Sequence, residues 1–464
     1  MIKLFPDQRD QIDRVAGSMR RGNKRVLMQA ATGAGKTIMA TEILHRAISK
    51  GSSTWFIVPR KELMRQTSKT YDKFKIPHSF IASGYNYDFT ATNFVCSLQT
   101  LTGRLDKLKP PAIAIIDETH YGGAGLDKVI KWLEANNCYI IGLSATPKKG
   151  NGDGMDKWYQ DLVIGLPMGE LIKLGRLSEF KLFAPSVPDL SDIKIVAGDY
   201  NKKQMGAWMD DHGEVLIGDA VTTYKNNAMG RLGITFASSI KESKRTAQAY
   251  RDAGVPACHL DGTVSHEVRQ AVINRFADRE LLQIVSVDIM CFGFDLAAQV
   301  GRDVVIECMS DVAPTKSEAK QLQKWGRVLR VKDNPAQIFD HAGNVFEHGM
   351  PDELRKWTLK GRDKRVRKEQ QEREIEMRQC KECYFCHPSG PHCPNCGNIY
   401  PIQSRVIKQV EGELEEIKTV QRKKEKRMEV GMAKSYKDLL AIENDRGYKK
   451  GWAYVLAKKK GLLK

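Results

Sequence analysis

The 464-residue chain has no run of apolar residues approaching the ~18 that a membrane-spanning helix needs. The first residues, 1–7, lack the apolar stretch of a secretory signal peptide, and no short period repeats along the sequence. These absences argue against an integral membrane protein, a secreted protein and a repeat array. With 41% hydrophobic residues, we expect a cytoplasmic globular protein with room for two core domains and smaller appendages.

Acidic residues are few relative to basic ones. The chain has 56 Asp and Glu against 74 Lys and Arg, which gives a net charge of +18 and an isoelectric point near 9.3. Such a charge predicts affinity for polyanions but no particular fold. Residues 351–464 hold 28 Lys or Arg and 17 Asp or Glu, a net charge of +11. This region is a candidate nucleic-acid-binding region, and the alternative is a solvated charged helix.

The ten cysteines fall into two groups. Five of them crowd between positions 380 and 396 and are treated below. The others are far apart, and we interpret them as small, reduced core residues of an intracellular protein. These scattered cysteines are Cys96, Cys138, Cys258, Cys291 and Cys308.

The segment Ala31–Thr37, which reads Ala-Thr-Gly-Ala-Gly-Lys-Thr, has the pattern of a phosphate-binding loop. The apolar stretch Val26–Met28 before it predicts a buried strand, and Ile38–Leu44 after it predicts a helix. Strand, glycine-rich turn and helix are the context that such a loop requires, although Ala30 stands where the strict pattern has glycine. Lys36 is expected to reach the β- and γ-phosphates, and Thr37 to bind Mg²⁺. The backbone N–H groups expected to bind the phosphates are those of Thr32, Gly33, Ala34 and Gly35.

An acidic pair follows a second apolar run, Ala112–Ile116, which predicts a central parallel strand. Ligands of open α/β sheets bind at the carboxyl ends of the strands. Asp117 is therefore a candidate Mg²⁺ ligand, and Glu118 is a candidate general base for an attacking water molecule.

These motifs, followed by Ser144-Ala145-Thr146 and by the segment Gln323–Arg330, resemble those of the superfamily 2 helicases and translocases in type and order. The resemblance covers about residues 4–345. It implies ATP as the nucleotide and two RecA-like domains. Within the superfamily, the cysteine cluster and the segment Gly447–Ala453 resemble most the RadD-like DNA-repair group and its phage relatives.

The resemblance also implies roles for residues of the second domain. Arg327 and Arg330 match the arginine fingers of the family, and their i, i+3 spacing predicts one shared helical face. Gln323 opens the same motif and is expected at the nucleotide. Gly293 and Asp295 match a further motif that contacts the nucleotide.

In the first domain, Gln8 matches the adenine-sensing glutamine of the family. Phe5 and Asp7 stand where relatives often have Arg and Tyr, which makes adenine recognition less secure than hydrolysis. The residues expected to couple hydrolysis to domain movement are His120, Ser144 and Thr146. Those expected to contact nucleic-acid phosphates are Arg60, Gln99, Thr100 and Ser238.

The pattern Cys380-x₂-Cys383-x₉-Cys393-x₂-Cys396 is typical of a structural Zn²⁺ site with four thiolate ligands. A disulfide cluster is the alternative, although the cytosol disfavours it. Cys386 could replace Cys380, because Cys383-x₂-Cys386 has the same spacing. We favour Cys380, since the residues after Cys383 and after Cys396 then run in parallel and give a pseudo-symmetric ribbon. The weaker alternative ligands are His387 and His392.

The predicted fold is α/β, with two tandem RecA-like domains of parallel sheets, residues 1–170 and 171–350. A charged helical linker (351–379, with one long helix over 352–378), a zinc ribbon (380–402) and a basic helical region (403–464) follow. Residues 185–209 are expected to be irregular. Tyr448, Trp452 and Tyr454 lie among lysines and either stack on bases or, with Val455, pack into a small core. The expected strands are 25–29, 54–58, 93–97, 112–116 and 139–143 in the first domain, and 232–236, 257–260, 282–287 and 303–308 in the second.

Together these features predict an ATP-dependent DNA helicase or translocase that acts on intermediates of repair, recombination or replication. Its expected cofactors are ATP, Mg²⁺ and Zn²⁺. Its expected partners are nucleic acid and a single-strand-binding protein. An RNA helicase, or an ATPase that only switches its affinity for nucleic acid, is the alternative, because contacts to phosphates barely distinguish the sugars. A restriction-type motor subunit is also conceivable, but the sequence has no convincing nuclease motif.

Overall fold

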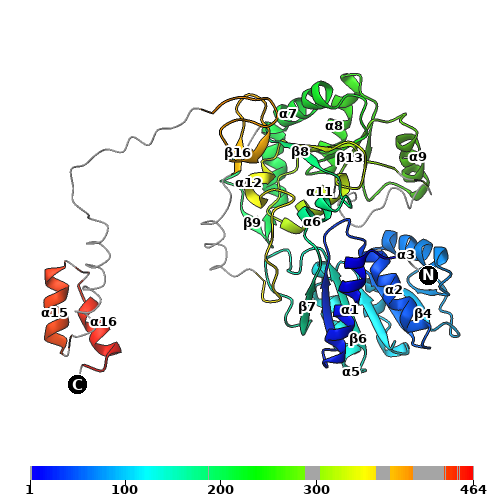
Figure 1. Cartoon of the computed structure of the whole chain (residues 1–464), viewed down its shortest axis with the longest axis horizontal. Coiled ribbons are helices and arrows are strands. Elements are labelled where there is room, and N and C mark those ends of the chain that lie inside the picture. The colour runs from blue at the N-terminus through cyan, green and yellow to red at the C-terminus, as the bar shows by residue number, and fades with distance from the viewer. Residues whose placement is uncertain are drawn as a thin grey trace. The chain divides into compact units, whose positions relative to one another are not determined.

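The computed structural model describes residues 3–185, 188–287, 302, 304–361, 377–400, 433, 435–446, 448 and 450–462. The chain divides into two compact units, Met1–Tyr400 and Pro401–Lys464, each of which is described by itself (Figure 1). The predicted nucleotide contacts Gly293 and Asp295 lie outside the described residues. Within those residues, every helix is too short or too polar to cross a membrane.

The first lobe is built on a sheet of seven strands in the order β3-β4-β2-β5-β6-β1-β7. Every pairing in it is parallel, as the alternation of strands and helices predicts. All five strands expected in this lobe are confirmed to within a residue. The strands are β1 (Arg25–Gln29), β2 (Thr54–Val58), β3 (Ser79–Ile81), β4 (Asn93–Ser97), β5 (Ile113–Ile116), β6 (Tyr139–Ser144) and β7 (Asp161–Ile164).

Helices cover both faces of this sheet, because its central strands are apolar on both sides. Apolar residues of α1, α2 and α3 pack on one face, and Figure 1 shows α1 and α2 in front of the strands. Residues of α4 and α5 pack on the other face. The helices are α1 (Pro6–Arg20), α2 (Lys36–Ile48), α3 (Lys61–Lys73), α4 (Leu98–Thr102) and α5 (Ala124–Ala135), with short 3₁₀ helices at Leu105–Lys107 and Thr119–Tyr121.

The second lobe has a sheet of six parallel strands in the order β12-β13-β11-β14-β15-β8. Residues of α6, α9 and α11 pack on one face, and residues of α7 and α8 pack on the other. Two parallel α/β lobes confirm the predicted fold class. The elements in the described residues of this lobe are α6 (Met168–Lys173), β8 (Phe180–Phe183), α7 (Lys202–Asn227), β11 (Gly233–Phe236), α8 (Ile240–Asp252), β12 (Ala257–Leu260), α9 (His266–Ala277), β13 (Gln283–Ser286), β14 (Cys308–Asp311), α11 (Glu318–Val328), β15 (Ala336–Asp340) and α12 (Asn344–His348).

Two local predictions for this lobe are wrong. The strand expected over 303–308 begins at Cys308 and ends at Asp311, because polar Ser310 and Asp311 are buried in the strand, where an apolar pattern cannot find them. The stretch 185–209 is not wholly irregular. It contains the hairpin β9 (Ile195–Val196) and β10 (Asp199–Tyr200), and α7 begins at Lys202, where the Asn201 side chain caps the backbone N–H groups of Lys203 and Gln204.

The expected long helix over 352–378 is also wrong in its described part. Residues 351–361, which we call the inter-lobe segment, form turns and extended chain. Its Leu359 carbonyl accepts the N–H groups of Met155 (2.7 Å) and Asp156 (3.2 Å) in the first lobe. Near its other end, Arg355 donates to the His348 carbonyl of the second lobe at 2.8 Å. The segment thus makes hydrogen bonds with both lobes in place of helical ones. Residues 362–376 lie outside the described part.

The cysteine-rich segment carries a small hairpin, β16 (Met377–Gln379) and β17 (Cys386–Pro388), that packs against the second lobe. Phe385 forms a β-bridge with Phe183 at the end of β8, and the Ala184 N–H donates to the Tyr384 carbonyl at 3.0 Å. Within the described residues, this segment therefore packs on the second lobe beside the end of β8.

In the described part of the second unit, the helices are α15 (Tyr436–Asp445) and α16 (Trp452–Lys459). Leu439, Ala453 and Ala457 form its small core, against which Trp452 packs. The prediction that Trp452 and Val455 pack into a small core is confirmed for Trp452. It is wrong for Val455, which is 67% exposed. Tyr454 is about half exposed, so the structure leaves this ring open to other contacts.

Candidate functional site

The phosphate-binding loop has the backbone that its sequence predicts. Gly33 and Gly35 adopt φ angles of +89° and +87°, which disfavour any other residue. A Cβ atom at Gly35 would lie 2.6 Å from Nε2 of Gln8, so the loop also has no room for a side chain there. Helix α2 begins at Lys36, directly after the loop. The loop thus ends at a helix N-terminus, where backbone N–H groups and the helix dipole favour a bound anion.

Gln8 lies against this loop. Its Nε2 donates to the Ala34 carbonyl at 2.9 Å, and its Oε1 accepts the N–H of Phe5 at 3.0 Å. Phe5 and Asp7, which differ from the family pattern, both contact Arg176. Sequence reasoning missed this contact. The Arg176 guanidinium lies 3.8 Å from the centre of the Phe5 ring and forms an ion pair with Asp7. No local pattern links these residues, because Arg176 is 169 positions from Asp7.

Asp117 and Glu118 follow β5, as predicted, and face the loop. Burial and the Glu118 carboxylate raise the pKa of Asp117 to about 7, while the positive charge of Lys36 opposes the shift. Glu118 has a left-handed backbone (φ 45°, ψ 44°), which is uncommon for a residue with a side chain. Such strained positions cluster at functional sites. The conformation is therefore consistent with the catalytic role predicted for Glu118.

His120, Ser144 and Thr146 form one buried network behind Glu118. Ser144 Oγ donates to the Thr146 carbonyl at 2.6 Å, and His120 Nδ1 lies 2.9 Å from Ser144 Oγ and 3.4 Å from a Glu118 oxygen. Since the serine proton goes to the carbonyl, we assign the imidazole proton to Nδ1. Burial lowers the pKa of His120 to about 4, so the imidazole is neutral at pH 7. The network links the acidic pair to the loop after β6.

The second lobe reaches the same site through α11. Gln323 Nε2 donates to Glu118 at 3.3 Å, and the Tyr121 hydroxyl donates to Gln323 Oε1 at 2.9 Å. A Cβ atom at Gly326 would lie 2.2 Å from Thr32 Cγ2, so the helix packs directly on the phosphate-binding loop. Arg327 lies on this helix and is 6% exposed.

One expectation about this helix is wrong. Helix α11 ends at Val328, and Arg330 lies beyond it in a β-bridge with Leu177. The two arginines therefore do not share a helical face. The chain leaves the helix there because residues 329–330 return to the segment that joins the lobes, where Ser178 donates its N–H to the Leu329 carbonyl at 2.9 Å.

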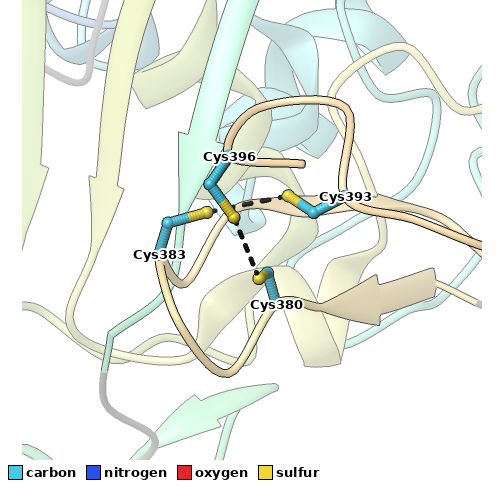
Figure 2. A group of neighbouring side chains, drawn as sticks. All are labelled: Cys380, Cys383, Cys393 and Cys396. Carbon is cyan, nitrogen blue, oxygen red and sulfur yellow. Dashed lines mark hydrogen bonds between the residues drawn. The ribbon is translucent and has the colours of Figure 1, made fainter. Parts of the chain in front are cut away.

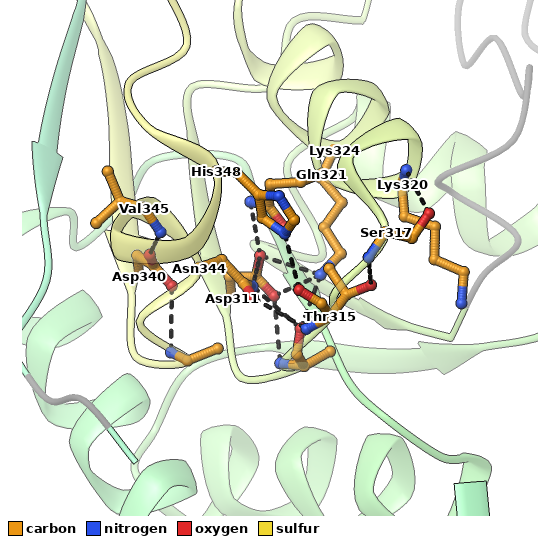
Figure 3. Close-up of polar contacts among 12 residues, drawn as sticks. Asp311, Thr315, Ser317, Lys320, Gln321, Lys324, Asp340, Asn344, Val345 and His348 are labelled. Atoms are coloured by element: carbon orange, nitrogen blue, oxygen red, sulfur yellow. Dashed lines mark hydrogen bonds and ion pairs between the residues drawn. The ribbon is translucent and has the colours of Figure 1, made fainter. Parts of the chain in front are cut away.

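A buried polar network holds α11 in place (Figure 3). Asp311, at the end of β14, accepts hydrogen bonds from Lys324 (2.8 Å), Gln321 (3.1 Å) and Asn344 (3.0 Å). Lys324 and Asp311 are both buried, and such pairs fix orientation, because loss of one partner leaves an unpaired charge. At the start of the helix, Glu318 forms ion pairs with Lys148 of the first lobe and with Arg355. Sequence reasoning missed this network, since its members come from separate segments.

The expected nucleic-acid contacts lie at the carboxyl ends of strands. Arg60 is exposed just after β2, Gln99 and Thr100 lie on α4 after β4, and Ser238 follows β11 of the second lobe. The Thr100 hydroxyl accepts the backbone N–H of Ser83 at 3.2 Å. Their contacts with nucleic acid stay predictions.

The sulfur atoms of Cys380, Cys383, Cys393 and Cys396 all lie within 4.8 Å of one another (Figure 2). Two matching turns place them. The Tyr384 N–H donates to the Cys380 carbonyl at 2.8 Å, and the Gly397 N–H donates to the Cys393 carbonyl at 2.9 Å. Both residues after the second cysteine have positive φ, +57° at Tyr384 and +75° at Gly397. The structure thus has the pseudo-symmetry that the sequence suggested.

The alternative ligands lie elsewhere. Cys386 is buried in the apolar core of the second lobe, and His387 Nε2 is 2.7 Å from the Tyr400 hydroxyl. The four-thiol donor set fits Zn²⁺, which takes tetrahedral thiolate ligands in structural sites. Burial alone would raise the pKa of the Cys380 thiol, but the backbone N–H groups of Cys383 and Glu382 outweigh it and bring the value to about 6. Those N–H groups would equally stabilise a metal-bound thiolate.

Substitution of single cysteines tests this ligand set. We expect Cys380→Ser to lower the bound zinc from about one ion per chain to well below it, because a structural site needs four ligands. Cys386→Ser should keep its zinc but lower the melting temperature, since it places a hydroxyl in an apolar core. Elemental analysis of the purified variants, together with thermal denaturation, measures both effects. Zinc loss in Cys386→Ser with retention in Cys380→Ser would contradict the assignment.

Two family models match the chain. The model described as "Type III restriction enzyme, res subunit" matches residues 1–149. These residues include the phosphate-binding loop and the acidic pair. The model described as "Helicase conserved C-terminal domain" matches residues 216–332 and contains α11. The chain belongs to the superfamily 2 helicases. Its two lobes are the RecA-like domains of this superfamily, and it is an ATP-hydrolysing enzyme of the helicase type.

The chain is also similar to whole proteins, one of which is named as a helicase. The chain is 28% identical to the "51.5 kDa protein" of a Lactococcus phage, over 71% of this chain and 68% of the phage protein. It is 25% identical to a Saccharomyces cerevisiae protein named as an ATP-dependent helicase, IRC3, over 72% of this chain. The chain spans about half (51%) of the length of that yeast relative.

Solved structures share the superfamily 2 fold. A fragment of an HsdR subunit of a type I restriction enzyme from Vibrio vulnificus superposes with a TM-score of 0.57 at 17% identity, over 74% of this chain and 65% of the fragment. Yeast Dbp5 bound to RNA superposes with a TM-score of 0.51 at 13% identity, over 77% of this chain and 94% of Dbp5. At such identities the likeness concerns the fold alone.

Proposed function

We propose that this superfamily 2 enzyme is an ATP-driven motor that moves along nucleic acid, with DNA as its favoured substrate. One observation carries the proposal. Gln323 of the second lobe contacts Glu118 of the first lobe, directly beside the phosphate-binding loop. A nucleotide between the lobes would touch both, so its hydrolysis would change how they pack. Movement of one lobe against the other is what a motor requires.

Each residue of the cleft has a proposed role in this cycle. Lys36 and the loop N–H groups bind the phosphates, while Thr37 and Asp117 hold Mg²⁺, which supplies charge neutralisation when bound. Glu118 accepts the proton of the attacking water. Arg327 supplies positive charge to the transition state, and Arg330 is the second candidate for that role. The remaining proposed roles are adenine or loop contact for Gln8, nucleotide contact for Gln323, and coupling for His120, Ser144 and Thr146.

DNA is favoured because one matched family model and one structural neighbour take their names from restriction enzymes. RNA is the alternative substrate, because a neighbour of the same fold, Dbp5, was solved bound to RNA. Action on repair, recombination or replication intermediates, as in the RadD-like group, belongs to this proposal, and a single-strand-binding protein stays a predicted partner. A cytoplasmic location fits, since cysteine thiols stay reduced in that compartment.

The experiment compares ATP hydrolysis with single-stranded DNA, duplex DNA, forked DNA and RNA of one sequence and length. We expect at least a ten-fold stimulation by DNA and a smaller one by RNA, with an ATP-dependent displacement of a labelled strand from the fork. Lys36→Ala, which loses its loop cation, is the inactive control. Stimulation by RNA alone would favour an RNA helicase. Stimulation without strand displacement or movement would favour the affinity switch.

A further inference from the structure

An exposed tyrosine stands at the edge of the first lobe, in the loop that follows β3. Tyr85 is 40% exposed, and its ring contacts that of Phe80 in a tilted arrangement with 4.6 Å between the centres. The turn before it contains Gly84 at φ +89°, with no atom within 4 Å of a Cβ built there. One side of the Tyr85 ring is thus supported by Phe80, while the residue as a whole remains open to solvent.

Sheet topology places this tyrosine beside the expected phosphate contacts. Strands β3, β4 and β2 are neighbours and run parallel, so their carboxyl ends meet at one edge. Arg60 follows β2, Thr100 follows β4, and Tyr85 follows β3. Since neighbouring strands lie ~4.8 Å apart, the ends of β2 and β3 are roughly 10 Å apart. The hydrogen bond from the Ser83 N–H to the Thr100 hydroxyl (3.2 Å) ties the tyrosine loop to the middle of this row.

We propose that Tyr85 is a base-stacking residue for single-stranded nucleic acid bound along this edge of the first sheet. The inference rests on the proposed function, because it names a contact of the same nucleic-acid path. A strand whose phosphates meet Arg60 and Thr100 has its next bases within reach of the tyrosine ring. Aromatic rings beside basic and hydroxyl groups bind single strands without a sequence preference, since every base has a π-face.

The same loop supplies a matched control. Phe89 is 88% exposed, but its ring meets the edge of Tyr87 at 4.8 Å, and Tyr87 stacks on Phe94 at 5.3 Å. Phe94 is the second residue of β4, so these contacts lie toward the amino ends of the strands. Phe89 is therefore an exposed aromatic residue of the same loop, away from the proposed path.

The test measures binding of the full-length protein to a fluorescent oligothymidine strand and to an abasic strand of equal length and charge. We expect Tyr85→Ala to bind oligothymidine about 10-fold more weakly and the abasic strand as wild type does, because only the base is lost as a partner. Tyr85→Phe should restore binding, since its ring stacks equally well. Phe89→Ala should behave as wild type on both strands. Hydrolysis of ATP without nucleic acid should be unchanged in all three variants, which controls for folding.

Two results would overturn the inference while the proposed function stands. One is wild-type binding of oligothymidine by Tyr85→Ala, and the other is an equal loss on both strands, which would assign Tyr85 to the backbone or to the fold. Absence of binding by the wild-type protein to any strand would overturn the proposed function and this inference with it. The wild-type and Tyr85→Ala measurements therefore distinguish the two failures.

Discussion

Replacement of Glu118 by Gln will leave ATP binding intact and lower the hydrolysis rate by about 10²–10⁴-fold, the usual contribution of a general base. The amide cannot take a proton from water at neutral pH. It can still accept the hydrogen bond that Gln323 donates to Glu118 at 3.3 Å, so the packing of the two lobes is expected to survive. Phosphate release measures turnover, and a fluorescent ATP analogue measures binding.

Two further variants sharpen this test. Lys36→Ala should lose binding as well as turnover, because the phosphates lose the loop cation. Glu170→Gln should behave as wild type, since Glu170 is an exposed residue of α6 whose described ion pair is with Lys173 at 2.8 Å. Hydrolysis near the wild-type rate by Glu118→Gln would remove Glu118 from the chemistry. The left-handed backbone at that position would then need another explanation.

The second large effect is expected for Arg327. Arg327→Ala should lower kcat by about 10³-fold or more with little change in ATP affinity, because an arginine finger meets charge that develops only in the transition state. Its position supports this expectation. The helix that carries it packs on the phosphate-binding loop at Gly326, and the buried Asp311–Lys324 pair holds that helix in the second lobe.

Steady-state kinetics at saturating nucleic acid separates kcat from KM for this variant. Arg275→Ala is the matched control, since Arg275 is an exposed arginine of the same lobe whose described ion pair is with Glu280 at 3.2 Å. Arg330→Ala tests the second predicted finger, which lies outside the helix. A large loss of ATP affinity with an unchanged kcat would make Arg327 a ground-state contact.

Local sequence patterns predicted much of this structure. Short apolar runs marked the five expected strands of the first sheet, because both faces of a parallel sheet are buried. The spacing of Cys380, Cys383, Cys393 and Cys396 marked the thiol cluster, since each pair needs only one tight turn. In both cases the residues that fix the structure lie close together along the chain.

What the sequence did not predict depends on distant partners. Asp311 can lie buried at the end of a strand because Lys324 and Asn344 donate hydrogen bonds to its carboxylate. The strand therefore has a polar residue at a position where an apolar one was expected. Residues 351–361 have a charged composition that suits a helix. Their Leu359 carbonyl instead meets the first lobe. Arg176, which follows α6, similarly forms an ion pair with the distant Asp7.

The inter-lobe segment has a mechanical consequence. The chain passes from the first lobe to the second between β7 and β8, and residues 351–361 return from the second lobe to the first, where the Leu359 carbonyl accepts the N–H groups of Met155 and Asp156. The chain connection and these hydrogen bonds lie at separate places and together restrict how the second lobe can turn against the first. The same nucleotide cycle should therefore follow fewer paths of movement, and weakening these hydrogen bonds should permit other paths, so that hydrolysis continues while less of it becomes directed travel.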